Sequence, residues 1–220
     1  MKSLTFDSRE EWLFSRKGKI TGSRLKDIIV KRGDGKKIGF FEVIAERLST
    51  DPEGMAFNET PMERGTRLEP EAMARFEEDT KKEVDKSLVL WAREENEGIA
   101  LSPDGFIVDK KTKKIKIAVE CKCLSSARFI EAYVKKFVWN KSDVDSIPNE
   151  YYEQIVQYFV VNDDLETLYM VFYDPRVVVK DYFYLTIKRK DVEVDTKQFL
   201  EYQITTIKEI DEIVNKISNF

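Results

Sequence analysis

Apolar residues recur along the chain with two periods, one typical of helices and one typical of strands. A spacing of three or four residues predicts helices at residues 8–16, 22–31, 39–48, 62–80 and 149–161. Runs rich in β-branched and aromatic residues predict strands at residues 85–92, 98–101, 104–109, 115–123, 167–173 and 181–188. With an amphipathic helix at the end, this order predicts an α/β (α+β) domain in which helices flank a central mixed β-sheet.

The last predicted helix carries its apolar residues in one stripe. The stripe comprises Ile204, Ile207, Ile210, Ile213, Val214 and Ile217. Such a stripe packs either against the core of its own chain or against another subunit. Residues 50–60 form a predicted loop, and Pro70 marks a kink or a new first turn within the helix at 62–80. No repeat or linker divides the sequence, so we treat residues 1–220 as a single domain.

The chain lacks the apolar segments that membrane insertion or secretion requires. Its longest stretch without a charged residue, 154–162, has nine residues, whereas a membrane helix needs about 20 apolar ones. The N-terminal residues do not form an apolar core flanked by small residues. We therefore expect no contact with a membrane and a location in the cytoplasm.

Charge is segregated in a chain whose net charge is −4. Residues 1–37 hold 11 Lys and Arg against 5 Asp and Glu, and residues 110–141 hold 10 against 2. These two segments carry +6 and +8, so the remainder of the chain carries −18. Each basic segment is either ordinary solvated surface or a face that contacts nucleic-acid phosphates, and composition does not separate the two.

The chain has no histidine, and this absence excludes several classes of enzyme. Serine–histidine triads, histidine–metal nucleases and metalloprotease motifs all require that side chain. Hydrolytic chemistry in this chain must therefore depend on carboxylates, lysine and metal. The two cysteines, Cys121 and Cys123, are too few for a structural zinc site, and we interpret them as small core residues.

The stretch SPDGFIVDKKTKKIKIAVECKC places charged residues inside two predicted strands. If residues 110–114 form a five-residue turn, residues 109 and 115 pair, and Asp104 then lies opposite Glu120. Directly opposed side chains on one face of a sheet have Cβ atoms about 5 Å apart. Two carboxylates at that spacing can hold a single cation.

Alternation along the second strand of this hairpin separates its side chains onto two faces. Glu120 and Lys122 share one face, and Cys121 and Cys123 share the other. We expect the odd-numbered face to be buried and Glu120 and Lys122 to be presented on the open face. A turn aspartate and an edge-strand ion pair would explain the same residues without any metal. The acid Glu69 on a preceding helix and the glutamine-bearing helix that follows favour a site.

Six blocks along almost the whole chain form a recognisable set. They are SRKGKITGS (15–23), RGTRLEPEAMARFEEDT (64–80), LSPDGF (101–106), VECKC (119–123), YYEQIVQYF (151–159) and YDPR (173–176). In this order and spacing they resemble the bacteriophage lambda exonuclease and YqaJ-type viral recombinase family of the PD-(D/E)xK nuclease superfamily. The chain departs from the family in its more basic residues 121–140. It also reads Gln-Ile-Val-Gln where relatives often have Gln-Val-Gln, so Gln154 or Gln157 faces the site, and we prefer Gln154.

The resemblance implies a restriction-endonuclease-like nuclease core that uses Mg²⁺, with Mn²⁺ as an alternative and two ions per site. The implied metal ligands are Asp104, Glu120, Glu69 and the backbone carbonyl of Cys121. Lys122 is implied to orient the attacking water, a task suited to a compact ammonium group. Gln154 is implied to brace the water or Lys122, with Tyr158 one helical turn later.

The resemblance also implies how the substrate end is held. Arg16 and Ser23 match family positions that bind the terminal 5′ phosphate, Arg16 by a forked charge-assisted contact and Ser23 near a helix start. Outside the resemblance, a surface ion pair and a helix N-cap explain these two residues. The implied substrate is linear double-stranded DNA with a 5′-phosphate end.

The function implied by the resemblance is a 5′→3′ exonuclease that degrades one strand and leaves 3′ single-stranded overhangs for phage-type homologous recombination. Family members form homotrimers that encircle DNA, and a single-strand annealing protein is the implied partner. Two alternatives stay open: an endonuclease with the same metal core, and a non-catalytic DNA-binding or annealing module. The second gains nothing from acids placed where a phosphate must lie, and the matches at Arg16 and Ser23 favour the exonuclease over the endonuclease.

Overall fold

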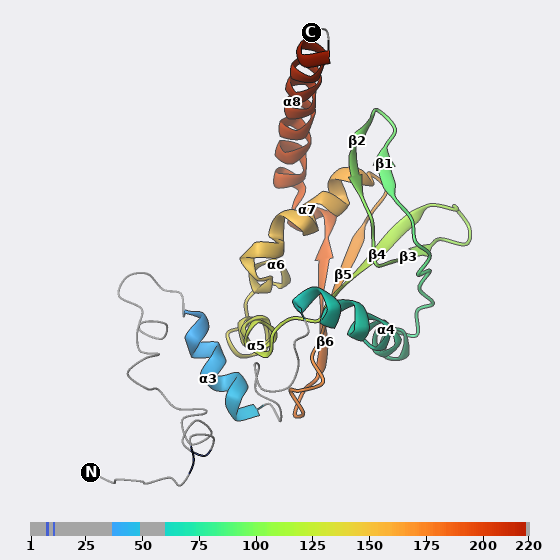
Figure 1. Cartoon of the computed structure of the whole chain (residues 1–220). Helices are drawn as coiled ribbons and strands as arrows, with labels where there is room; N and C mark the ends of the chain where they lie inside the picture. Colours follow the sequence, from blue (N-terminus) through green and yellow to red (C-terminus); the bar gives the residue numbers. More distant parts are fainter. Residues whose placement is uncertain (1–7, 9–10, 12–36, 49–59, 219–220) are drawn as a thin grey trace.

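The structure is a computed structural model that describes residues 8, 11, 37–48 and 60–218 (Figure 1). The helices predicted at 8–16 and 22–31 and the loop at 50–60 fall almost entirely outside these residues. Arg16 and Ser23 also lie outside the described residues, so their predicted contacts are not addressed by the fold.

A four-stranded mixed sheet forms the centre of the domain, as the sequence predicted. Its strands, in spatial order, are β3 (Gly105–Val108), β4 (Ile115–Lys122), β5 (Thr167–Tyr173) and β6 (Tyr182–Lys188). Only β4 and β5 run parallel, and the other two neighbouring pairs are antiparallel. A parallel pair needs a crossover connection, and here the crossover contains three α-helices. They are α5 (Ser126–Tyr133), α6 (Asp143–Ser146) and α7 (Tyr152–Val161).

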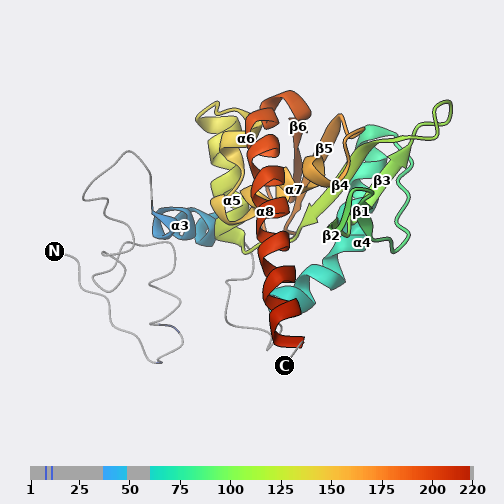
Figure 2. The ribbon, with the colours of Figure 1, turned by 90° about the horizontal axis from the view of Figure 1, so that it is seen from above.

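Helices cover the sheet on both faces (Figure 2). On one face, α4 (Pro61–Thr80) buries Leu68, Ala72, Met73 and Phe76 against the sheet. On the other face, α5 and α7 complete the larger core. The expectation that β4 leaves one face open is therefore wrong: Glu120 is only 2% exposed, because the crossover helices cover its side of the strand.

The start of α4 is fixed by a capping box, which also fixes the helix that carries Glu69. The Thr60 side chain accepts a hydrogen bond from the Glu63 amide, and the Glu63 carboxylate accepts one from the Thr60 amide at 2.8 Å. Pro61 occupies the first helical turn, where its missing N–H is harmless. Pro70 lies inside α4, so no new helix begins there.

The β3–β4 hairpin has the predicted register near the sheet centre and departs from it at the turn. Gly105 pairs with Val119, but an irregularity follows Ile107, and the Asp109 amide donates to the Lys114 carbonyl. The predicted pairing of 109 with 115 is therefore wrong by one residue. The turn accommodates this shift through Lys113, whose φ of 61° lies in the left-handed region.

Several other elements differ from the predicted ones. Only β1 (Trp91–Arg93) forms within the strand predicted at 85–92, and it pairs with β2 (Asn96–Leu101) outside the central sheet. The helix α3 (Ile38–Leu48) confirms the prediction at 39–48 and packs against α5. The sequence analysis missed α5, α6 and the π-helix η2 (Val134–Val138). Two short 3₁₀ helices, η3 (Asn149–Tyr151) and η4 (Arg189–Asp191), precede α7 and the last helix.

The last helix, α8 (Glu193–Ser218), projects beyond the rest of the domain (Figure 1). Of its predicted stripe, Ile207 packs against the core, whereas four members on either side of it are exposed. The exposed members are Ile204, Ile210, Ile213 and Ile217, each at least 47% exposed. They therefore do not belong to the core of this chain. Among the described residues, no helix combines the length and the apolar character needed to span a membrane.

Candidate active site

A cavity of about 610 Å³ opens where β4 ends, between the first turns of α4 and the start of α7. It is lined by all the predicted site residues that fall within the described part of the chain: Glu69, Asp104, Glu120, Cys121, Lys122 and Gln154. Arg64, Arg128 and Tyr151 also line it, and the sequence analysis did not single them out. Residues from five parts of the sequence thus meet in one place.

Glu120 is the most enclosed carboxylate in this cavity. Its Oε1 accepts hydrogen bonds from Lys122 Nζ at 2.5 Å and from Gln154 Nε2 at 2.6 Å. Its Oε2 accepts a hydrogen bond from the hydroxyl of Tyr158, a buried residue of α7. Burying a carboxylate costs free energy unless hydrogen-bond donors surround it. The donors from α7 and Lys122 therefore stabilise Glu120 in its buried position.

The structure distinguishes the two glutamines of α7. Gln154 faces Glu120, whereas Gln157 donates to the Ala100 carbonyl and exchanges hydrogen bonds with Gln203 on α8. Gln157 therefore joins α7 to α8 and β2, away from the cavity. The single extra residue in Gln-Ile-Val-Gln leaves Gln154 on the face that meets β4.

Asp104 lies in the bend just before β3, level with the end of β4. One of its carboxylate oxygens accepts a hydrogen bond from the Cys121 amide at 2.8 Å. Burial raises the pKa of Asp104 to about 7, and repulsion from Glu120 adds to this. The neighbouring Gly105 cannot carry a side chain, because a Cβ atom there would lie 2.5 Å from Val84 Cγ1.

Glu69 contributes a third carboxylate from α4. Burial raises its pKa, and the charge of Glu120 raises it further. The acids therefore repel one another across the cavity, and only Lys122 among the described residues is seen to offset the charge of all three. A cation placed among these acids would relieve their repulsion.

Lys122 is held between a carboxylate and an aromatic ring. Its ammonium group contacts Glu120 and lies 4.8 Å from the centroid of the Tyr151 ring. The negative face of the ring attracts the cation, so Tyr151 fixes the direction of the lysine side chain. The only sequence signal for Tyr151 was its spacing of three residues before Gln154.

The cysteines have a structural role. Cys123 is buried, Cys121 is partly buried, and both pack with the α4 side of the core. Burial raises the pKa of Cys123 to about 12 and that of Cys121 well above its ordinary value. Both thiols therefore stay protonated at neutral pH, which confirms the interpretation as small core residues.

The YDPR block anchors the chain that leaves β4. Arg176 donates to the Leu124 carbonyl at 3.2 Å and pairs with the buried carboxylate of Asp174. The Ser126 hydroxyl also donates to Asp174, at 2.6 Å. These bonds fix residues 124–126 directly after Lys122, so the block supports the cavity without lining it.

Two arginines form the basic part of the cavity. Arg64 donates from Nε to the Cys123 carbonyl at 3.3 Å, and Arg128 pairs with Glu131 and Glu150. Only part of the basic segment 110–141 reaches the cavity, because Lys114 and Lys116 form ion pairs with Asp164 and Glu166 elsewhere. Of the basic residues in this segment, Lys122 and Arg128 line the cavity.

The residues present fit a magnesium ion in the chemistry of their donors. No three acidic or cysteine side chains among the described residues stand close enough together to enclose a metal. Magnesium, however, keeps several waters and is usually bound by one or two carboxylates together with substrate phosphates. Asp104 has a free oxygen and a raised pKa caused by burial and neighbouring acids, which a divalent cation would relieve.

A mixed sheet thus gathers three carboxylates, a lysine and a glutamine around one cavity at the end of β4. A protein-family model described as the YqaJ-like viral recombinase domain matches residues 11–164. The match covers well over half of the chain, so this protein belongs to the YqaJ-like viral recombinase domain family. The family resemblance found in the sequence is thereby confirmed.

Solved structures similar to the chain are described as exonucleases. The alkaline exonuclease LHK-Exo from Laribacter hongkongensis, solved alone and in complex with dAMP, is 25% identical, with a TM-score of 0.49. The alignment covers 94% of this chain and 99% of that one. A phage-related exonuclease from Haemophilus somnus 129PT is 14% identical, with a TM-score of 0.48 and coverage of 89% and 94%. No curated protein matches the chain significantly.

Proposed function

We propose that this protein is a metal-dependent exonuclease that degrades one strand of linear duplex DNA from the 5′ end. The product would be a 3′ single-stranded overhang, the substrate of phage-type homologous recombination. The observation that carries the proposal is the meeting of Glu69, Asp104, Glu120 and Lys122 in one cavity of a chain from the YqaJ-like family. Acids that repel one another have no structural advantage there, whereas a cation bound among them would stabilise them and could in turn bind a phosphate.

The proposed metal ligands are Asp104, Glu120, Glu69 and the backbone carbonyl of Cys121. We propose Mg²⁺ as the preferred ion and Mn²⁺ as an alternative. Each site would hold two ions. When bound, the metal neutralises charge on the scissile phosphate and lowers the pKa of the attacking water. Asp104 must lose its proton before it can act as a ligand, because its pKa is raised to about 7.

Lys122 would orient the attacking water. Its ammonium group has three donors, of which one is directed at Glu120 and the others remain available to water or to a phosphate oxygen. Gln154 and Tyr158 hold Glu120 from α7, so the carboxylate keeps its position while the substrate changes. Arg64 and Arg128 line the same cavity and would contact phosphates on either side of the scissile bond.

Further parts of the proposal rest on the family resemblance alone. Arg16 and Ser23 would hold the terminal 5′ phosphate, three copies of the chain would encircle the DNA, and a single-strand annealing protein would take up the product. The protein would act in the cytoplasm of the host cell. An endonuclease with the same metal core, or a DNA-binding module, are the competing functions.

The deciding experiment compares linear duplex labelled at the 5′ or the 3′ end with closed circular duplex, in magnesium and in EDTA. We expect magnesium-dependent loss of the linear duplex, with the 5′ label released first and the circle intact. Cleavage of the circle would identify an endonuclease. Binding of linear duplex without any degradation in magnesium or manganese would identify a binding module.

A further inference from the structure

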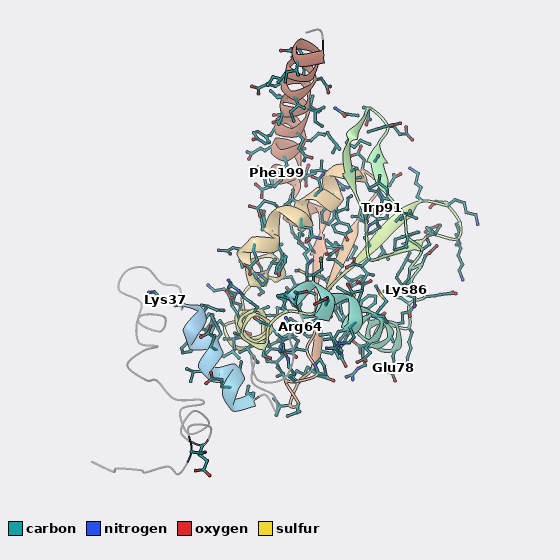
Figure 3. All side chains as sticks on the ribbon, viewed as in Figure 1. Lys37, Arg64, Glu78, Lys86, Trp91 and Phe199 are labelled. Atoms are coloured by element: carbon teal, nitrogen blue, oxygen red, sulfur yellow. The ribbon has the colours of Figure 1, made fainter. Side chains whose placement is uncertain are left out.

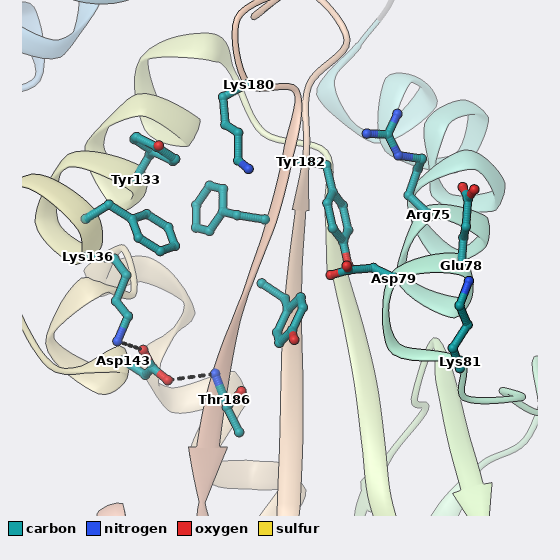
Figure 4. A pocket seen from close by; sticks show the side chains of 13 residues that line it. Arg75, Glu78, Asp79, Lys81, Tyr133, Lys136, Asp143, Lys180, Tyr182 and Thr186 are labelled. Atoms are coloured by element: carbon teal, nitrogen blue, oxygen red, sulfur yellow. Dashed lines mark hydrogen bonds and ion pairs between the residues drawn. The ribbon is translucent and has the colours of Figure 1, made fainter.

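A second and larger cavity, of about 1080 Å³, runs along the outer edge of β6 (Figure 4). It lies at the far end of α4 from the active site: Arg64 lines the active-site cavity and Glu78 lines this one (Figure 3). One wall is the C-terminal half of α4, and the other is formed by α5 and η2. We refer to this cavity as the β6 groove.

The floor of the β6 groove is an edge strand with open backbone positions. The Thr186 amide donates to Asp143 at 3.0 Å and the Lys188 amide to Asp191 at 2.9 Å, so the even-numbered amides point away from β5. By the alternation of an antiparallel pair, the amides and carbonyls of Tyr182 and Tyr184 point the same way. In the part of the chain that the structure describes, no group pairs with them there.

A buried hydroxyl also lacks a partner in the β6 groove. Tyr182 is 8% exposed, and its hydroxyl makes no hydrogen bond with any described residue. An unpaired buried polar group costs free energy unless a ligand or water satisfies it. On the opposite wall, Phe137 is 47% exposed and packs with Tyr133 and Phe183, at ring distances of 4.8 and 5.7 Å. The groove therefore offers both a polar group and an aromatic surface.

Charge at the end of the β6 groove is positive. Lys180 lies at the start of β6, is exposed and makes no ion pair with any described residue (Figure 4). Of the other cations that line the groove, Arg75 pairs with Asp181 and Lys136 pairs with Asp143, and Lys81 lies at the C-cap of α4. The Lys180 end is complementary to an added negative charge.

We propose that the β6 groove binds an extended peptide segment of a partner protein, which adds a short strand to β6. The strand would hydrogen-bond the backbone of Tyr182 and Tyr184 and stop at Thr186, whose amide Asp143 already occupies. Alternate side chains would face the two walls: apolar ones towards Tyr133 and Phe137, and polar ones towards α4 and the Tyr182 hydroxyl. An acidic residue would lie at the Lys180 end.

Other occupants fit the β6 groove less well. A groove walled by α4 on one side and by α5 and η2 on the other leaves space for a single extended strand, and a second folded copy would have to fit its own walls into the same space. Nucleic acid needs a surplus of cations, but the four basic residues that line the groove are accompanied by the acids Glu78, Asp79 and Asp143. The backbone edge and the aromatic wall therefore favour a peptide.

The test uses the full chain and, as probe, a displayed library of random ten-residue peptides. The most enriched peptide is labelled and titrated by fluorescence anisotropy against wild type, Lys180→Glu and Phe137→Ala. We expect an alternating sequence with an acidic residue near one end, and roughly tenfold weaker binding for each variant. Lys190→Glu, a charge reversal in η4, and Val138→Ala, an exposed truncation beside Phe137, are matched controls that should bind as wild type does.

Hydrogen exchange provides the second measurement. The amides of Tyr182 and Tyr184, which point away from β5, should exchange more slowly when the peptide is bound. Lys180 and Phe137 lie outside the active-site cavity, so both variants should keep any nuclease activity of the wild type. The peptide-binding proposal can thus fail while the proposed nuclease function holds. The proposed nuclease function can equally fail while peptide binding is observed.

Several results would overturn the proposal. One is a library that yields no binder, or binders that tolerate both variants and leave exchange at β6 unchanged. Loss of binding to a labelled twelve-nucleotide thymidine strand in Phe137→Ala would assign the groove to nucleic acid. A change in sedimentation of Lys180→Glu would assign it to a second copy of the chain. Slow exchange of the Tyr182 and Tyr184 amides without added peptide would assign it to a segment of the same chain.

Discussion

The hydroxyl of Tyr158 donates a hydrogen bond to Glu120, which joins the centre of α7 to the end of β4. Both residues are buried, and burial raises the pKa of Tyr158 well above its ordinary value, so the phenol remains a donor over the whole neutral range. The bond therefore holds the carboxylate in one position before any metal or substrate arrives.

Tyr158→Phe should lower cleavage about tenfold while the protein stays folded. A hydrogen bond to a charged group contributes about 1.5–3 kcal/mol, and its loss leaves Glu120 with one fewer donor. Steady-state cleavage and the melting temperature measure the two effects. Tyr173→Phe removes a similar bond, to Glu71 at 2.9 Å, outside the cavity and should leave cleavage unchanged. An equal loss of cleavage in both variants would mean that the hydrogen bond from Tyr158 to Glu120 has no special role at the site.

Asp104→Ala and Glu120→Ala should each abolish cleavage while binding of DNA persists, because each removes a proposed metal ligand. Magnesium titration by calorimetry should show weaker or absent binding in both. Asp109→Ala, at the exposed turn of the same hairpin, is the matched control and should keep its activity. Near-normal turnover by either cavity variant in magnesium would remove that carboxylate from the site.

Lys122→Ala should inactivate the enzyme without unfolding it, because the lysine is proposed to orient water and not to support the core. Lys122→Arg should not restore activity, since a planar guanidinium cannot replace a compact ammonium. Lys116→Ala changes the same residue type on the same strand, where the lysine pairs with Glu166, and should remain active. A large fall in melting temperature in Lys122→Ala would instead make the lysine structural.

The stability of the metal-free protein should fall as the pH rises from about 4 to about 7. Asp104 has a pKa of about 7 in the folded chain against an ordinary value of 3.8, so the folded state binds more protons in this window. Thermal unfolding in EDTA measures the effect, and Asp104→Asn should flatten it. Magnesium should raise the melting temperature more at pH 8 than at pH 5.5, because protons compete with the metal. An unchanged pH profile in Asp104→Asn would contradict this assignment.

Arg16→Ala should slow digestion of 5′-phosphorylated duplex about 10- to 100-fold and erase the preference over 5′-hydroxyl ends. The expectation follows from the family match and from a charge-assisted hydrogen bond of about 1.5–3 kcal/mol. Lys17→Ala, the neighbouring charge in the same basic segment, is the control. If Arg16→Ala slows digestion of 5′-phosphorylated and 5′-hydroxyl duplex equally, and the salt dependence of DNA binding weakens, Arg16 is a general contact to the DNA backbone.

Local sequence predicted the strands of the hairpin, but not the pairing at its turn or the surroundings of the hairpin. The predicted register holds at Gly105 and Val119 because the irregularity after Ile107 offsets the wrong pairing at the turn, and Glu120 and Lys122 share a face because of the strand period. The burial of Glu120 was not predictable from that period, because its cover comes from α7, much later in the chain. The strand predicted at 85–92 failed for a similar reason: beyond a bridge from Asp85 to Phe106, no neighbouring strand pairs with its first half.

The sequence predicted those site residues whose side chains have a distinctive chemical role. Carboxylates and a lysine at strand spacing were visible, and the family blocks supplied Glu69 and Gln154. Tyr151, Arg64 and Arg128 were missed because such residues are common and nothing local distinguishes them. Their roles depend on α4, η3 and α5 converging on the end of β4, which is a property of the tertiary structure.

The parallel pairing of β4 with β5 has a consequence for the order in which the parts of the chain fold. Ile117 pairs with Thr167 and Lys122 with Phe172, so these contacts have a large sequence separation and a high entropic cost of loop closure. The β3–β4 hairpin can form early from nearby residues, but Glu120 gains its α7 donors and its β5 neighbour only after the intervening helices have been synthesised. On a translating ribosome, the proposed nuclease would therefore stay inert until the chain beyond Tyr173 had emerged.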